Sequence, residues 1–183
     1  MGQTFDRLDE KLLAFIARQK VFFVATAPLS AAGFVNLSPK GYDTLAIIDP
    51  NTIAYLDLGG SGIETFAHVR ENGRITLMFC AFEGRARILR LHGVGEAVSF
   101  DEPGYDALRS LFPGHGKARS VVRVRLTRIA DSCGWGVPFY DFKGERDQLE
   151  RYIDHMSAED WEESLHAGGA ASIDGLPGLV RAR

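Results

Sequence analysis

Short runs of alternating apolar and polar residues, separated by turn-forming residues, constrain the fold of this 183-residue chain more than any other feature. Residues 21–27 and 34–40 are two such runs, and the connection between them, rich in Pro, Ser, Ala and Gly, predicts a β-hairpin with a long loop. Residues 44–48 and 52–57 form a second pair around the turn-favouring sequence Asp49-Pro50-Asn51. Alternation predicts strands because successive side chains of a strand point to opposite faces of a sheet.

Later segments extend this pattern. Residues 74–80 and 85–100 are predicted strands, and Gly93 and Gly95 predict a bulge or bend within the second of them. Residues 120–129 alternate strongly, with Val122, Val124 and Leu126 on one face and Arg123, Arg125 and Thr127 on the other. Six or so strands with few crossover helices predict a mainly β fold, an antiparallel barrel that carries peripheral helices.

Three helices are predicted within this pattern. Apolar residues at helical spacing predict an amphipathic helix over residues 6–18. Residues 63–71 predict a second helix, with Ser61 as its N-cap and Glu64 completing a capping box. Residues 101–111 predict a short third helix.

The C-terminal part of the chain predicts a helical pair, over residues 146–156 and 158–165. Residues 167–183 are rich in Gly, Ala and Pro and are expected to form an extended tail. Residues 1–166 are therefore expected to form a single domain, which is the default at this length.

The composition bounds the function. The chain is 45% hydrophobic and 25% charged, with a formal net charge of -3, so no overall charge favours a nucleic-acid partner. A run of basic residues could be taken for a nucleic-acid-binding face, although one solvated strand face is the commoner explanation. This run comprises Lys117, Arg119, Arg123, Arg125 and Arg128.

Cysteine usage and the N-terminus bear on the compartment. Cys80 and Cys133 are the only cysteines and form no CxxC motif, so a reducing compartment is expected. The histidines show no HExxH or HxH spacing, and no metal site is predicted. The N-terminus lacks the apolar region of a signal peptide, and no apolar run reaches membrane-spanning length. A soluble, cytoplasmic protein without a membrane partner is expected.

The end of the first hairpin is a candidate binding site. Asn36 and Ser38 are expected on the same strand face as Phe34, and the strand then ends in Pro39-Lys40-Gly41. Small polar groups followed by a lysine could line a site for a polar, anionic ligand. A solvent-facing edge strand, with Pro39 marking the edge, explains the same residues about equally well.

The sequence GGSGIET, residues 59–65, is a second candidate. A glycine-rich loop that leads into a helix can hold a phosphate with backbone N–H groups and the positive end of the helix. The sequence is neither a P-loop nor GxGxxG, and a flexible turn followed by a helix cap is the alternative interpretation.

Three segments, in their order and spacing, resemble the pyridoxamine 5'-phosphate oxidase-like family of FMN-binding split β-barrels. They are FVNLSPKGYD (residues 34–43), YLDLGGSGIETFAHVRENGRITLMF (residues 55–79) and SCGWGVPFY (residues 132–140). The resemblance spans roughly residues 8–140. It implies an antiparallel six-stranded split β-barrel with peripheral and C-terminal helices, and a homodimer with FMN at the subunit interface.

The resemblance also implies which residues contact FMN. From one subunit these are Val35, Asn36, Leu37, Ser38, Pro39, Lys40, Tyr55 and Leu56, with Ser61, Glu64 and Thr65 near the phosphate and the ribityl chain. From the other subunit they are Arg87 or Arg90, and Trp135 with Gly136 and Val137. A tryptophan flanked by glycine can approach a planar ring closely, although Trp135 could equally be an ordinary core or interface anchor.

The chain departs from pyridoxamine phosphate oxidases in two places. Those enzymes carry a Ser-Arg-Lys triplet near the phosphate, whereas this chain offers Ser61, Glu64 and Thr65. The phosphate charge would then have to be met by Lys40, by backbone amides or by an arginine from elsewhere. Those enzymes also end in an Arg-x-His-Asp-Arg segment, which this chain lacks.

We therefore expect an FMN-binding oxidoreductase that acts on an unidentified small substrate, with a small-molecule or nicotinamide electron donor, and not a true pyridoxamine phosphate oxidase. The flavin would carry the redox chemistry, so no catalytic side chain is assigned. The alternative is a non-catalytic protein that binds or senses flavin or haem on the same barrel.

Overall fold

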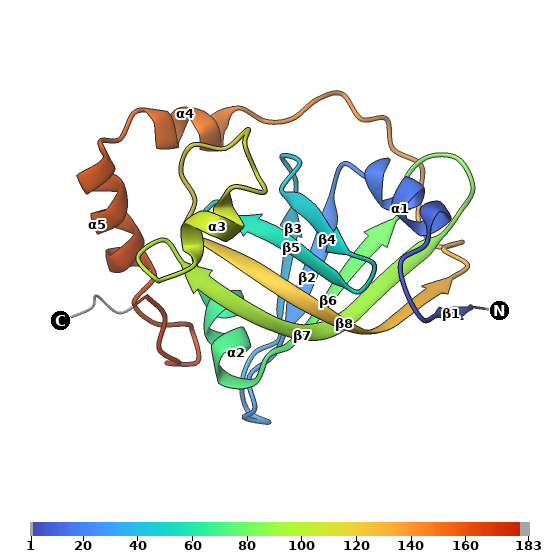
Figure 1. Cartoon of the computed structure of the whole chain (residues 1–183), viewed down its shortest axis with the longest axis horizontal. Coiled ribbons are helices and arrows are strands. Elements are labelled where there is room, and N and C mark those ends of the chain that lie inside the picture. Colours follow the sequence, from blue (N-terminus) through green and yellow to red (C-terminus); the bar gives the residue numbers. More distant parts are fainter. Residues whose placement is uncertain (1, 180–183) are drawn as a thin grey trace.

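The structure is a computed structural model that describes residues 2–179. Its centre is an eight-stranded antiparallel sheet in the order β3-β2-β6-β7-β8-β5-β4, with the short β1 paired to β8 (Figure 1). The path ends at β3 and β4, and the sheet is not closed. The strands are β1 (Thr4–Phe5), β2 (Phe22–Thr26), β3 (Asn36–Lys40), β4 (Leu45–Asp49), β5 (Thr52–Asp57), β6 (Arg74–Cys80), β7 (Ile88–Ser99) and β8 (Ser120–Ser132).

Five helices among residues 2–179 lie around this sheet (Figure 1). They are α1 (Glu10–Ala17), α2 (Glu64–Asn72), α3 (Tyr105–Arg109), α4 (Gln148–Asp154) and α5 (Ala158–Gly168). No helix among residues 2–179 combines the length and apolarity needed to cross a bilayer. The prediction of a mainly β, antiparallel fold with peripheral and C-terminal helices is confirmed, although the sheet has eight strands and not six.

Strand β5 shows how the pleat organises the interior. Ile53 and Tyr55 point into the main core, where they meet apolar side chains of α1, α2, α5 and the other long strands. Ala54 and Leu56 point the other way, into a smaller cluster that includes Tyr105 of α3. Each large apolar side chain buried in this way stabilises the fold by about 1.5–3 kcal/mol.

Strand pairing follows the sequence pattern closely. The first hairpin pairs Phe22 with Lys40 and Thr26 with Asn36, and β6 has the predicted bounds. The register shifts between His92 and Gly93, where a bulge or bend was predicted. On β8 the alternation is also confirmed, because its valines are buried while the intervening arginines are exposed.

The N-cap of α2 and the start of α3 were predicted wrongly, although the predicted range of α2, residues 63–71, is within one residue of the observed helix. Ile63 is the N-cap of α2, and no side chain caps this helix, so Ser61 and Glu64 form no capping box. The reason is local backbone geometry: Gly62 has φ +110°, which only glycine adopts readily, and it separates Ser61 from the helix. The short helix α3 likewise starts after Gly104, and not at the predicted residue 101.

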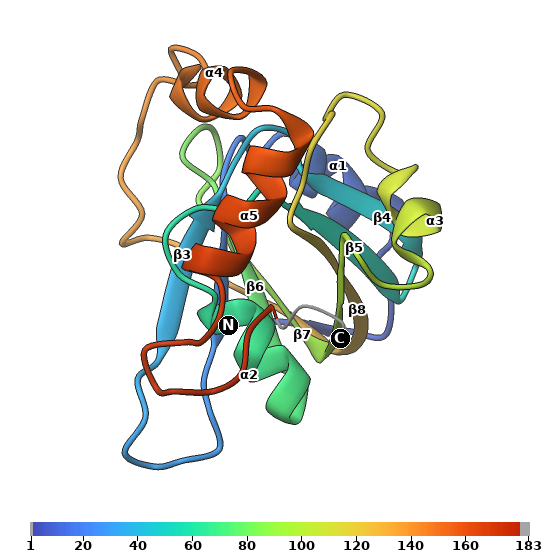
Figure 2. The ribbon, with the colours of Figure 1, turned by 90° about the vertical axis from the view of Figure 1, so that its left-hand side faces the viewer.

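The C-terminal part of the chain returns to the glycine-rich loop. Residues 133–147 cross from the end of β8 to α4 without regular structure (Figure 1). After α5, residues 169–179 fold back on themselves, with a bridge between Ala171 and Pro177 and with Leu179 buried in the main core. This folded loop lies beside α2 (Figure 2), whereas the sequence favoured an extended tail.

Candidate functional site

A small polar pocket lies where β3, the glycine-rich loop and the start of β8 meet. Its volume is about 190 Å³. It is lined by Asn36, Ser38, Lys40, Gly59, Gly60, Ser61, Gly62, Glu64, Thr65 and Arg119. The structure thus brings together both candidate motifs of the sequence, the polar face of the hairpin and the GGSGIET loop.

Strand β3 places its polar residues in this pocket by simple alternation. Asn36, Ser38 and Lys40 face inward and are partly buried, while Leu37 and Pro39 face outward and are exposed. The Asn36 amide donates to the Thr65 hydroxyl at 2.8 Å and accepts from the Ser38 hydroxyl at 3.0 Å. These bonds fix the inward face of β3 against the start of α2.

Lys40 and Arg119, the two cations that line the pocket, share one buried carboxylate, that of Asp57. Asp57 is only 3% exposed, and its Oδ2 accepts from Arg119 Nε at 2.9 Å and lies 2.8 Å from Arg119 Nη2. Lys40 Nζ lies 3.5 Å from Asp57 Oδ1. Two cations against one buried carboxylate leave one positive charge in excess around Asp57, which favours an anionic ligand there. Glu64 places a negative charge elsewhere in the pocket lining.

Arg119 also ties the glycine-rich loop to the sheet. Its Nη1 donates to the carbonyl oxygen of Gly62 at 2.7 Å and lies 3.4 Å from that of Gly60. The guanidinium therefore makes charge-assisted bonds to the carboxylate on one side and to the loop on the other. This buried side chain therefore helps to hold the loop in place.

The ion pairs decide the protonation of Asp57. Burial raises the pKa of this carboxyl, but the positive charges of Lys40 and Arg119 outweigh burial and hold its pKa below the ordinary value. A lowered folded-state pKa stabilises the protein above the unfolded pKa of about 3.9, and this stability is lost as pH falls through the folded value.

We expect this linkage to appear in acid unfolding. Asp57→Asn should destabilise the protein at pH 7, and its difference from wild type should shrink as pH falls below about 4, where wild-type Asp57 also becomes neutral. The free energy of unfolding in urea, measured from pH 7 to pH 3, checks this. Asp106→Asn, at an exposed position, is the control; a difference independent of pH would contradict the assignment.

The glycine-rich loop presents the uncapped start of α2 to the pocket. Gly62, Glu64 and Thr65 line the pocket, and no side chain satisfies the first N–H groups of the helix. Ser61 lines the pocket as well, and its side chain does not cap the helix. Glu64 is an anion at the rim, where its Oε1 accepts from the backbone N–H of Ile173 at 3.3 Å.

Tyr55 lies beneath the pocket and carries an unusual hydroxyl. The side chain is fully buried, and its ring centroid is 5.9 Å from Lys40 Nζ. Its hydroxyl makes no hydrogen bond of good geometry with the described residues, although the Thr65 side chain lies near it. Burial, followed by the negative charge of Asp57, holds the pKa of this phenol well above its usual value.

We expect Tyr55→Phe to be neutral or to stabilise the ligand-free protein by about 1 kcal/mol, because a buried polar group without a partner costs free energy. Urea unfolding without ligand measures the change. Tyr105→Phe is the matched control and should destabilise, since the Tyr105 hydroxyl donates to Ala118 O at 2.8 Å. Destabilisation of Tyr55→Phe by as much as the control would contradict the expectation.

An open apolar groove adjoins the pocket. It has a volume of about 530 Å³ and shares Asn36, Ser61, Gly62 and Glu64 with the pocket. The remaining lining residues are Phe34, Val35, Leu37 and Ile173, all exposed apolar side chains. The polar pocket is charged and the adjoining groove is apolar, so the two together suit a ligand with one charged and one apolar part.

The other predicted site residues lie outside the pocket of their own chain. Leu56 is buried in the smaller core cluster, and Pro39 faces outward. Arg87 binds Asp131 at 2.7 Å, and Arg90 donates to the Ser132 hydroxyl at 3.0 Å. Trp135, which is 86% exposed, and its neighbours Gly136 and Val137 line neither the pocket nor the groove. Their contribution to the site of a second subunit stays a prediction.

Arg119 is the main site residue that the sequence did not identify. It belongs to the basic run that was assigned to a solvated strand face, yet it is only 6% exposed. The signal that could have found it is Asp57, a carboxylate at the end of a buried strand, which requires a cation nearby. The pairing of Asp57 with Ser120 places Arg119 beside it.

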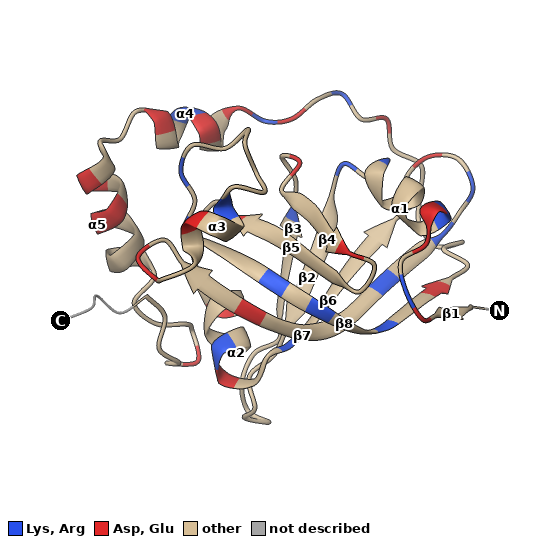
Figure 3. Cartoon of the chain, viewed as in Figure 1, with Lys and Arg blue, Asp and Glu red and all other residues tan. Residues whose placement is uncertain are grey.

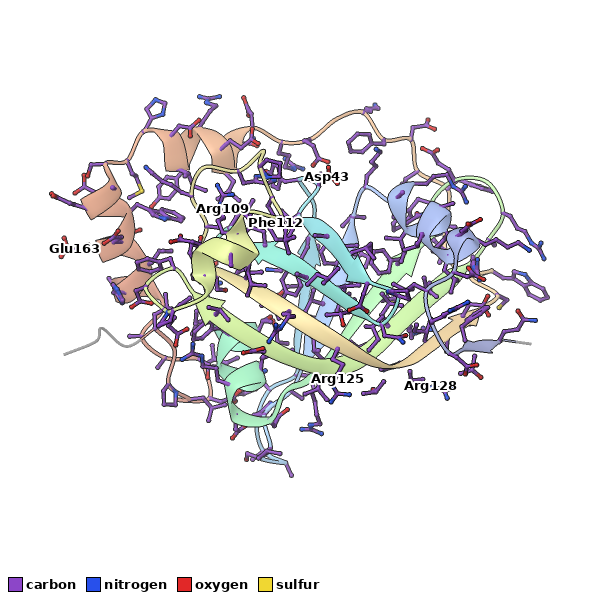
Figure 4. All side chains as sticks on the ribbon, viewed as in Figure 1. Asp43, Arg109, Phe112, Arg125, Arg128 and Glu163 are labelled. Atoms are coloured by element: carbon purple, nitrogen blue, oxygen red, sulfur yellow. The ribbon has the colours of Figure 1, made fainter. Side chains whose placement is uncertain are left out.

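The rest of the basic run does not form a continuous basic surface. Arg123 pairs with Glu96 of β7, and Lys117 donates to the carbonyl oxygens of Ile153 and Met156. In Figure 3 an acidic position on β7 lies beside the basic positions of β8. In Figure 4 the labelled side chains of Arg125 and Arg128 point away from the ribbon of β8, as expected for a solvated strand face.

Solved structures of other proteins share this fold. The crystal structure of HupZ from Group A Streptococcus matches with a TM-score of 0.54 and 23% identity over 67% of this chain and 91% of that one. A HupZ variant matches with a TM-score of 0.55 and 22% identity over 68% and 98%. At these identities the likeness shows the fold alone, and it agrees with the split barrel that the sequence resemblance implied.

Two sequence comparisons extend beyond the fold. The family model described as pyridoxamine 5'-phosphate oxidase matches residues 8–133. The pyridoxamine 5'-phosphate oxidase family protein ustO of Aspergillus flavus is 33% identical over 196 residues, which cover 96% of this chain and 77% of that protein. The chain therefore belongs to the pyridoxamine 5'-phosphate oxidase family.

Proposed function

We propose that the protein is an FMN-binding oxidoreductase that acts on a small substrate through the flavin. The observation that carries this proposal is the pair of cations around Asp57. Lys40 and Arg119 place one excess positive charge beside a glycine-rich loop and the uncapped start of α2. Backbone N–H groups at a helix start together with lysine or arginine are the usual ligands of a phosphate group.

The residues present fit the phosphate end of FMN. A Cβ atom built at Gly60 would meet nothing within 4 Å, so the space over the loop is open to a ligand. The phosphate would be held by Lys40, Arg119, the Ser61 hydroxyl and backbone N–H groups of residues 61–65. Glu64, as an acceptor at the rim, suits a ligand hydroxyl better than a phosphate oxygen.

The rest of the molecule would lie along the apolar groove. Val35 and Leu37 supply exposed apolar surface there, and Asn36 and Ser38 supply hydrogen-bonding groups at the junction with the pocket. The bound flavin would supply hydride or electron transfer, while the side chains of the chain bind and orient it and set its surroundings.

The proposal includes a homodimer with FMN at the interface. Exposed aromatic side chains gather on the segment after β8, and apolar side chains lie on the outer face of β3, which supports a covered surface. Those after β8 are Trp135, Phe139, Tyr140 and Phe142. The residues that would reach the second subunit's site are Arg87 or Arg90, with Trp135, Gly136 and Val137. Light scattering should give the mass of a dimer.

We do not propose oxidation of pyridoxamine phosphate, because the chain passes from β8 into α4 and α5 without the Arg-x-His-Asp-Arg segment of those enzymes. A peroxide-coupled assay with pyridoxamine phosphate should give little or no turnover. Efficient turnover would show that other residues hold the substrate phosphate.

The test of the function is spectroscopic. Purified protein is titrated with FMN, riboflavin and haemin, and the flavin complex is then mixed rapidly with NADH or NADPH. We expect flavin bands, tighter binding of FMN than of riboflavin, and bleaching by a reductant. A Soret band with haemin and no flavin binding would replace this function with haem binding, and no binding at all would overturn the site.

A further inference from the structure

The C-terminal part of the chain lies behind the candidate site. The family model ends at residue 133, whereas residues 158–179, hereafter the C-terminal segment, pack on the glycine-rich loop. A Cβ atom at Gly59 would lie 3.1 Å from a ring carbon of Trp161 and 3.3 Å from Leu165. The C-terminal segment is therefore part of the wall behind the pocket.

One carboxylate of this segment reaches two elements of the site. Asp174 Oδ1 accepts from the backbone N–H of Phe34 at 3.0 Å, just before β3 begins. Asp174 Oδ2 lies 3.2 Å from Nε2 of His68, in α2. His68 has no exposed surface, and the Asp174 side chain is 9% exposed, so the contact between them is largely shielded from water. The bond from Phe34 to Asp174 lies at the exposed surface.

From His68 a chain of hydrogen bonds leads into the pocket. His68 Nδ1 lies 3.0 Å from the Thr26 hydroxyl, which accepts from the Asn36 amide at 3.2 Å. The same amide donates to Thr65 at 2.8 Å, and the Asn36 carbonyl oxygen accepts from the Ser38 hydroxyl at 3.0 Å. Asn36, Ser38 and Thr65 all line the pocket.

The carboxylate sets the direction of every bond in this chain. An ionised carboxylate only accepts, so the proton of a neutral His68 must lie on Nε2, facing Asp174. Nδ1 is then an acceptor, and the Thr26 hydroxyl must donate to it. Thr26 therefore accepts from Asn36, whose carbonyl oxygen is left to accept from Ser38.

This direction determines what Ser38 offers a ligand. Because the Ser38 hydroxyl proton is used on Asn36, its oxygen faces the pocket as an acceptor. An acceptor here favours a ligand hydroxyl or N–H and disfavours a phosphate oxygen. Lys40, two residues further along the same face, meets the anionic part instead.

We propose that Asp174 is a positioning residue for the flavin site: through His68 it orients Asn36 and Ser38 toward the non-phosphate part of the ligand, and through Phe34 it fixes the start of β3. This inference rests on the proposed flavin function. Its distinguishing consequence is that Asp174 acts equally on FMN and on riboflavin, which share every group except the phosphate.

The experiment has two independent measurements. In ligand-free protein, NMR of the His68 ring nitrogens reports which nitrogen carries the proton. We expect the neutral form protonated at Nε2 in wild type, and a loss of that single form in Asp174→Asn. Affinity for FMN and for riboflavin is expected to fall alike in Asp174→Asn, by about tenfold each, as for a lost hydrogen bond to a charged group.

Matched variants separate positioning from simple stability. Asp106→Asn changes an exposed aspartate of α3 and should alter neither measurement. His68→Asn keeps an acceptor near Thr26 and should bind flavin better than His68→Gln, which keeps a polar group only near Asp174. Equal affinities of these two variants would indicate a structural role and overturn the proposal.

The failures of the two proposals can be told apart. A wild-type His68 ring protonated at Nδ1, or unchanged flavin affinity in Asp174→Asn, overturns the role of Asp174 and leaves the flavin function intact. Wild-type protein that binds no flavin overturns the proposed function, whereas the ring spectrum still tests the direction of the hydrogen bonds.

Discussion

Arg119→Ala should lower the free energy of unfolding by about 3–5 kcal/mol, because it leaves the buried carboxylate of Asp57 with only part of its compensation. Lys40 remains 3.5 Å from that carboxylate, so the lower end of the range is expected. The carbonyl oxygens of Gly60 and Gly62 lose their donor at the same time. Urea unfolding of ligand-free protein measures the change.

Arg123→Ala, four residues further along the chain in β8, is the matched control. Arg123 also pairs with a carboxylate, Glu96, but both side chains are about half exposed, and exposed pairs contribute less than about 1 kcal/mol. Asp57→Asn combined with Arg119→Ala should recover part of the lost stability, since the unpaired buried charge is removed. Equal losses for Arg119→Ala and Arg123→Ala would show that burial of the Asp57 pair is not what stabilises the loop.

The strands were predictable from the sequence because each leaves a local signature. Period-two alternation located β2, β5, β6 and β8 to within a few residues, and the turn residues between β4 and β5 identified that hairpin. Strand β1 has two residues, too few for any periodicity, and its existence depends on pairing with β8. The N-cap of α2 and the start of α3, which were predicted wrongly, follow glycines with positive φ angles that no side-chain pattern records.

The sequence predicted only those site residues that lie close together along the chain. Asn36, Ser38 and Lys40 alternate on one strand, and Ser61 stands in a recognisable glycine-rich loop. Arg119 became a site residue through the pairing of β5 with β8, a contact between segments 62 residues apart. The arginines that follow it along β8 are solvated, so the basic run as a whole favoured assigning Arg119 to a solvated strand face, which is wrong.

The role of the C-terminal segment was least predictable. Its Gly-, Ala- and Pro-rich sequence is typical of an extended tail, and neither Asp174 nor His68 belongs to a motif. Their contact joins residues 106 positions apart. A buried histidine on a helix gives no signal in one sequence, because an exposed helix histidine produces the same pattern.

Lys40→Met should weaken FMN binding about 100-fold and leave riboflavin binding nearly unchanged, because Lys40 is expected to meet the phosphate that riboflavin lacks. A charge-assisted hydrogen bond of about 1.5–3 kcal/mol corresponds to roughly ten- to 150-fold in affinity. Methionine keeps the apolar stem over the Tyr55 ring, and Arg119 still compensates Asp57, so the fold should survive. Fluorescence titration with both flavins measures the split.

The control for charge alone is Lys20→Met, which removes a lysine outside the polar pocket and should change neither affinity. Net charge is the same in both variants, so a difference between them reports position and not long-range attraction. Asp174→Asn should show the opposite signature, an equal loss for both flavins. If Lys40→Met instead weakened FMN and riboflavin alike, Lys40 would act on the shared part of the ligand, and the phosphate would have to lie elsewhere along the loop.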